Sequence, residues 1–302
     1  MSDVSQPATP TRRRRPAGSV PWFWVLPAVA VVIAFRYVAT GAGTWYAFTD
    51  WDGLSDATWV GLDNFREILD DPASRGALEN TIKLAFTFVV TANVIGLALA
   101  LALHRTLKTR GLLRAIFFVP VVMSSLAVSY VWQFIFSYTG PLNSLLDALG
   151  LESAQRAWTG DPTWALWTIF VVLVWQFVGL SMVMYLAGLE GIPEELDEAS
   201  AVDGASTFRR FRKITLPLLA PAITVSVTLS TIYGLGVFDQ VLAVTGGGPV
   251  DASETLATQI YKQTFAFGRF GYGTALSLVL TVLITILAVA QLLVLRARER
   301  RL

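Results

Sequence analysis

Residues 198–217 of this chain read EASAVDGASTFRRFRKITLP and lie between two long apolar segments. Just before them, Pro193 suits the first turn of a helix, and the acidic residues that follow it place negative charge at the positive N-terminal end. Asp203-Gly204 is typical of a turn, after which 207–215 can form a second short helix. The stretch therefore predicts a polar helix-turn-helix between two apolar helices.

The composition of the 302 residues is that of a polytopic membrane protein. Hydrophobic residues make up 54% and charged residues 15%, and the mean hydropathy is +0.56, which is too apolar for an ordinary soluble fold. The absence of cysteine excludes disulfides, thiolate metal sites and cysteine nucleophiles. His104, the single histidine, is predicted to be a solvated flanking residue, so we expect neither a metal site nor a Cys/His nucleophile.

Six apolar segments are long enough to cross a bilayer, since about 20 helical residues cover roughly 30 Å. We predict an all-α membrane protein with six transmembrane helices at about 20–40, 82–103, 115–137, 163–187, 214–238 and 271–295. Prolines and glycines inside the fifth segment predict a kink there. The expected division is a disordered cytoplasmic N-terminus at 1–19, rich in Ser, Pro and Thr, and a transmembrane domain at 20–302.

The basic residues give the direction of the segments. Arg and Lys recur in runs at 12–15, 105–114, 209–213 and 296–301, whereas the alternate loops carry few of them. Cytoplasmic loops hold the excess of positive charge, so both termini and 198–217 are placed in the cytoplasm. An arginine run before an apolar segment also begins a secretory signal, but this apolar run approaches 20 residues and has no convincing cleavage site, which favours a membrane anchor.

Taken alone, the features of 198–217 also fit an amphipathic loop whose basic residues obey the charge rule. The complete pattern, however, resembles the EAA loop of binding-protein-dependent ABC importer permeases, with serine replacing the second alanine. The resemblance implies a type I ABC importer permease fold in which a cytoplasmic EAA coupling helix contacts a separate ATPase. The residues that match this coupling motif are Glu198, Ala199, Ser200, Asp203, Gly204, Ile214 and Pro217.

No GxxxxGK[ST] phosphate loop occurs in the chain, so we expect ATP and Mg to be bound by the partner ATPase and no cofactor to be bound here. The chain is accordingly predicted not to be an enzyme.

A second motif narrows the family. Residues 238–249 read FDQVLAVTGGGP and 261–276 read YKQTFAFGRFGYGTAL. The glycines alone fit a flexible surface turn, but together the two segments resemble carbohydrate permeases of the maltose, lactose and glycerol-3-phosphate type. The resemblance implies that this chain is the first of the two unlike permease subunits of such an importer. The loop expected to face an extracytoplasmic binding protein contains Gly246, Gly247, Gly248 and Pro249.

The predicted function is that of the transmembrane subunit of an ATP-driven importer for a sugar delivered by a binding protein. Its expected partners are a second related permease, a cytoplasmic ATPase dimer, the binding protein and the lipid bilayer, but no nucleic acid. We expect it in a bacterial-type inner membrane, as a multi-pass protein. The alternatives are a permease for a glycerol-3-phosphate-like solute, a secondary transporter, and an integral-membrane glycosyl transferase; the secondary transporter would more often show charged residues deep in its spans and an inverted repeat.

Polar side chains inside apolar segments are costly enough to need a partner, a cavity or a substrate. The candidates for a substrate path are Gln176, Tyr233, Asn93, Gln133, Tyr185 and Asp239. Trp132 and Trp175 could stack on a sugar ring. For each of them, hydrogen bonding between helices or a place at the membrane interface is the competing interpretation.

Overall fold

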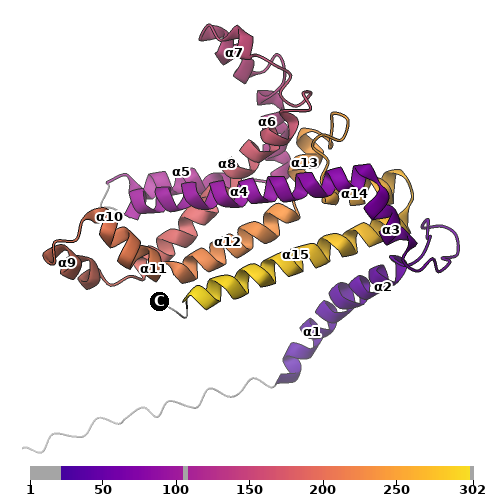
Figure 1. The fold of residues 1–302 in the computed structure, drawn as a ribbon, viewed down its shortest axis with the longest axis horizontal. Coiled ribbons are helices and arrows are strands. Elements are labelled where there is room, and N and C mark those ends of the chain that lie inside the picture. The colour runs from indigo at the N-terminus through magenta and orange to yellow at the C-terminus, as the bar shows by residue number, and fades with distance from the viewer. Residues whose placement is uncertain (1–21, 105–107, 300–302) are drawn as a thin grey trace, which may run out of the picture. The chain divides into compact units, whose positions relative to one another are not determined.

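The computed structural model describes residues 22–104 and 108–299, which are mostly helical (Figure 1). Within these residues the one β feature is an isolated bridge between Thr49 and Trp59. The N-terminus predicted to be disordered, 1–19, lies outside the described residues. The chain divides into two units, 1–43 and 44–302, which we describe separately.

The first unit consists of one apolar helix. It is built from η1 (Trp22–Val25), α1 (Leu26–Val32), the π-helical η2 (Ile33–Val38) and the start of α2 (Ala39–Tyr46). Together they give a helix of 24 residues, Phe23–Tyr46, long enough to cross a membrane. The predicted start at residue 20 lies outside the described residues, and the helix ends at Tyr46, six residues after the predicted 40.

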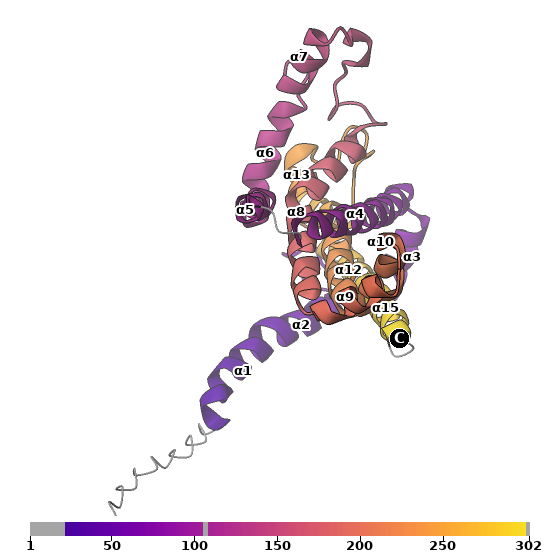
Figure 2. The same ribbon diagram turned by 90° about the vertical axis from the view of Figure 1, so that its left-hand side faces the viewer.

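The described part of the second unit contains three helices of 26 to 33 residues and a series of shorter ones. Its elements are α3 (Asp63–Asp70), α4 (Pro72–His104), α5 (Arg110–Val122), α6 (Ser125–Ile135), α7 (Pro141–Ala148), η3 (Glu152–Ala154), α8 (Ala165–Glu190), α9 (Glu194–Val202), α10 (Thr207–Arg210), η4 (Phe211–Thr215), α11 (Leu216–Leu218), α12 (Ala220–Leu235), α13 (Asp239–Val244), α14 (Leu256–Tyr261), η5 (Lys262–Ala266) and α15 (Phe270–Glu299). Helix α4 begins ten residues before the predicted second span. Figure 2 shows α7, beyond the end of α6, lying away from the long helices of this unit.

Small residues allow the long helices to pack closely. Helix α4 packs most extensively against α8 and also contacts α12, while α12 contacts α15. A Cβ on Gly96 would lie 2.6 Å from the Cβ of Ser181, and one on Gly179 would lie 2.8 Å from the carbonyl carbon of Phe117. Such close approach of backbones is how membrane helices gain packing energy, because lipid offers no hydrophobic drive for association.

Two predicted spans are broken rather than straight. Helices α5 and α6, predicted as 115–137, meet at 99°, and the helices across 214–238 meet at 68°. Pro120 lacks an amide hydrogen and interrupts the ladder of α5, after which Met123 takes an extended conformation. The break in the fifth segment confirms the predicted kink, but the break in the third was not expected. The described residues thus contain four helices able to cross a membrane, or up to six if each bent pair is one span.

Candidate functional site

Two short helices occupy the segment predicted as a helix-turn-helix. Helix α9 ends at Val202, and the chain turns at Gly204, whose φ of +74° favours glycine. Ser206 caps α10 by accepting a hydrogen bond from the Arg209 amide at 3.4 Å. The π-helical η4 then leads into α11, which contains Pro217. The loop is consequently a folded element with its own turn and cap.

A hollow of about 730 Å³ lies between this loop and the ends of α4 and α8. Glu198 and Ile214 line it, together with Arg210 and the exposed His104. On the outside of the loop Val202 is 89% exposed. The loop therefore has a hollow and an exposed apolar side chain that a second protein could contact.

The remaining motif residues differ in exposure. Ala199, Asp203 and Gly204 are exposed, Ser200 is buried and Pro217 is half-buried. A Cβ on Gly204 would meet no atom within 4 Å among residues 22–104 and 108–299. The exposed members of the motif therefore lie where a second protein could reach them.

Asn93 joins three long helices through its side chain. Its Oδ1 accepts hydrogen bonds from the Tyr185 hydroxyl of α8 and the Ser226 hydroxyl of α12, both at 2.7 Å. Its Nδ2 donates to Val89 O at 2.8 Å and to the Ser230 Oγ at 3.3 Å. Both polar atoms of the Asn93 side chain thus have hydrogen-bond partners, which come from α4, α8 and α12.

A second polar cluster lies further along α12 and centres on Gln240 of α13. Its Nε2 donates to Gln176 Oε1 at 2.9 Å and to the Tyr233 hydroxyl at 3.0 Å. Gln176 in turn donates to Met123 O at 3.4 Å, at the break between α5 and α6. Both glutamines are fully buried. The cluster therefore connects the broken third segment, α8 and the end of the fifth segment.

A smaller hollow of about 260 Å³ opens beside these clusters. Phe177, Ser226, Ser230 and Tyr233 contribute to its lining. The ring centroids of Phe177 and Tyr233 are 4.0 Å apart. Hydroxyl groups and aromatic faces therefore meet in one concave region.

The predicted path residues fall into separate places. Asn93 pairs with Tyr185 in one cluster, and Gln176 with Tyr233 in the other. Gln133 is exposed and donates to Val244 O at 3.4 Å, so it belongs to neither.

Asp239 is exposed at the start of α13, while Trp132 and Trp175 pack edge to face with centroids 5.6 Å apart. Sequence reasoning missed Gln240, although it lies inside the quoted 238–249, and it missed Ser226 and Ser230, whose spacing of four residues in an apolar helix was the available signal.

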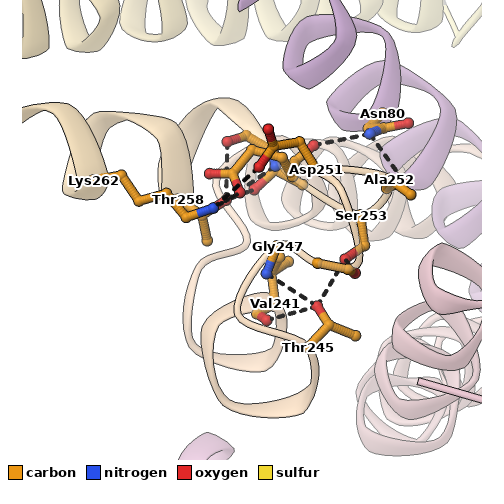
Figure 3. Close-up of polar contacts among 12 residues, drawn as sticks. Asn80, Val241, Thr245, Gly247, Asp251, Ala252, Ser253, Thr258 and Lys262 are labelled. Carbon is orange, nitrogen blue, oxygen red and sulfur yellow. Dashed lines mark hydrogen bonds and ion pairs between the residues drawn. The ribbon is translucent and has the colours of Figure 1, made fainter. Parts of the chain in front are cut away.

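The glycine loop after α13 is held by hydrogen bonds within residues 245–253 and by a hydrogen bond from α4 (Figure 3). Thr245 Oγ1 lies 2.8 Å from Ser253 Oγ, and the Gly247 amide donates to Thr245 Oγ1 at 3.2 Å. Ser253 also donates to Gly248 O at 2.6 Å. Asn80 of α4 donates to Ala252 O at 3.2 Å. These bonds describe a closed loop attached to α4 rather than an unsupported surface turn.

The fold resembles that of type I ABC importer permeases. It superimposes with a TM-score of 0.78 and 22% identity on a chain of a bacterial ABC transporter involved in the import of the acidic polysaccharide alginate, covering 93% of this chain and 95% of that one. Residues 92–300 match the family described as the binding-protein-dependent transport system inner membrane component. The chain belongs to this family, which confirms the family that the sequence resemblance predicted.

Two curated relatives extend the similarity over nearly the whole chain. A probable starch degradation products transport system permease protein of Thermoanaerobacterium thermosulfurigenes is 31% identical over 92% of this chain and 95% of its own length. The multiple sugar-binding transport system permease protein of Streptococcus mutans is 33% identical over 90% and 94%. Both are permeases that their names connect with sugars.

Proposed function

We propose that this chain is the transmembrane subunit of an ATP-driven carbohydrate importer and that both of its termini lie in the cytoplasm. The observation that carries the proposal is similarity over at least nine-tenths of the chain to permeases named for starch products and for multiple sugars. The alternating basic runs of the sequence support the orientation. A binding protein outside the membrane would deliver the sugar.

The loop of α9 and α10 is the proposed contact with an ATPase dimer. Glu198, Ala199, Ser200, Asp203, Gly204, Ile214 and Pro217 would shape the seat, and the ATPase would hold ATP and Mg. Coupling requires that ATP binding favour one arrangement of the spans over another. The open turn at Gly204 and the exposed Val202 support the proposal because a neighbouring protein can approach both.

The sugar path is proposed to run along the polar face of α12, past Asn93, Tyr185, Gln176 and Tyr233. Sugar sites combine a few placed hydrogen-bonding groups with an aromatic surface. The 260 Å³ hollow offers both, because hydroxyl groups line it beside the Phe177 and Tyr233 rings. Gln133 and Asp239 would contribute only nearer the glycine loop, as would the Trp132 and Trp175 pair.

The glycine loop, Gly246 to Pro249, is proposed to face the binding protein. Next to it Val250 is 93% exposed, which supports a protein contact at this position.

Helix α12 presents exposed apolar side chains at Val225, Leu229 and Ile232. We propose that a second, related permease covers this face.

Reconstitution tests the function directly. The chain would be co-expressed with its cognate second permease and ATPase, placed in proteoliposomes, and assayed for uptake from a panel of labelled sugars and glycerol 3-phosphate. We expect uptake of a sugar only with internal ATP and the loaded binding protein. Sugar uptake by this chain alone, or uptake driven by an ion gradient without ATP, would overturn the proposal.

A further inference from the structure

The glycine loop lies against an ion pair with a buried carboxylate, Glu254–Lys262, that no step of the proposed transport uses. The Glu254 side chain is 0% exposed, and its Oε2 accepts a hydrogen bond from Lys262 Nζ. Lys262 keeps 28% of its side chain exposed and also contacts Asp251 Oδ1 at 3.4 Å. Helix α14, which begins with a capping box between Thr255 and Thr258, lies between Glu254 and Lys262, the first residue of η5. The pair therefore joins the end of the loop to the helix that follows it.

The backbone of the glycine loop lies directly on this pair. A Cβ on Gly247 would come within 2.8 Å of the Glu254 carboxyl carbon and 3.0 Å of Lys262 Nζ. Gly247 has φ +87°, so both space and conformation require glycine there. Asn80 completes the arrangement by donating to Glu254 O at 3.0 Å (Figure 3). The loop thus closes over the carboxylate and onto α4.

Burial makes the carboxylate depend on its partner. Burial raises the pKa of Glu254, and the hydrogen bond and charge of Lys262 offset only part of the rise. Glu254 Oε1 is buried and has no hydrogen-bond partner among the described residues. An ionised carboxylate left without Lys262 would have to be hydrated or protonated. Hydration would require the loop to move, because Gly247 lies directly against the Glu254 carboxylate.

We propose that the Glu254–Lys262 ion pair is a positioning device. It holds residues 245–255, which include the glycine loop, in the shape to which the solute-binding protein docks. The inference rests on the proposed function, since it assumes that docking partner. Val250 is the exposed apolar residue that the closed loop presents, with φ +50°. Neither charged residue would touch the binding protein; both act through the loop.

Glu254 and Lys262 should respond differently to the loss of the other residue, because Glu254 is fully buried and Lys262 is partly exposed. This difference makes the test specific. Lys262→Met leaves a fully buried carboxylate without a cation. Glu254→Gln leaves a lysine that is partly exposed and still contacts Asp251. The double variant restores a neutral pair of similar size. Lys83→Met is the matched control, because Lys83 forms an exposed pair with Glu79 in α4, and such pairs contribute little.

The complete importer would be assembled in nanodiscs with each variant, and ATP hydrolysis would be measured against the concentration of loaded binding protein. In Lys262→Met we expect the half-saturating concentration to rise about tenfold, as when only about one loop in ten is closed. Glu254→Gln should change it less, and the double variant should restore it. Hydrogen exchange of the 245–255 amides, measured without binding protein, should rise and fall in the same order. Lys83→Met should match the wild type in both measurements.

Each outcome decides the matter. Faster exchange with unchanged docking would show a merely structural pair and overturn the inference, as would unchanged exchange in Lys262→Met. Failure of the double variant to recover would assign the effect to the methionine. If the wild-type importer itself does not respond to any binding protein, the proposed function fails and the inference fails with it. That result is separable because it appears before any variant is made.

Discussion

The turn at Gly204 allows the proposed ATPase contact to be tested apart from the fold of the loop. Gly204 has φ +74°, and a Cβ there would meet no atom of the described residues within 4 Å. An L-residue in this conformation costs roughly 1–2 kcal/mol through its backbone, and the described part of the chain adds no steric cost. Gly204→Ala should therefore weaken binding of the ATPase by about 5- to 30-fold. Gly204→Asn should cost less, because asparagine tolerates this conformation better.

Gly204→Trp has nearly the same backbone cost as Gly204→Ala and differs mainly in bulk. If the ATPase lies against the turn, tryptophan should abolish assembly and uptake while alanine only weakens them. Gly150→Trp is the control, because Gly150 has φ +70° and is equally open in the chain between α7 and η3. The assay is the affinity of the detergent-solubilised permease pair for the ATPase, with thermal unfolding measured in parallel. Equal effects of tryptophan and alanine, with uptake preserved, would refute the reasoning.

Two further predictions concern the transmembrane helices. Gly179→Ala should destabilise the permease by about 1–3 kcal/mol or more, because its Cβ would overlap the Phe117 carbonyl group of α5; Gly76→Ala, in open space on α4, should instead stabilise it by about 1 kcal/mol. Gln240→Leu should lower the free energy of unfolding by about 1–2 kcal/mol and the Tm by about 2–4 °C. The reason is that it removes the amide that donates to Gln176 Oε1 and to the Tyr233 hydroxyl. Thermal unfolding in detergent measures these changes. For Gln240→Leu, sugar uptake should show a raised KM, and an unchanged KM would place the residue outside the sugar path.

The sequence was a good guide wherever the signal is local. Apolar length predicts helices at 163–187 and 271–295, and the structure has α8 at Ala165–Glu190 and α15 at Phe270–Glu299. The turn residues at 203–204 predict where α9 ends and the chain turns toward α10. Proline and glycine density also predicts the bend in the fifth segment. The bend in the third segment was missed because one proline, Pro120, can be tolerated in a membrane helix or can break it, depending on what replaces the lost hydrogen bond.

Partners across helices could not be read in the same way. Gln176 was a candidate for its position in an apolar segment, yet its acceptor role toward Gln240 depends on how α8 and α13 meet. Asn93 and Tyr185 were named separately, and only packing brings them within 2.7 Å.

By itself the sequence predicted a membrane protein and showed a resemblance to ABC importer permeases, because hydropathy, charge and motif spacing are properties of short stretches. The tertiary structure decided which polar groups satisfy one another and that Glu254 is covered by the glycine loop. Burial of a charge depends on atoms from α4, the loop and η5 together. No local pattern around Glu254 carries that information.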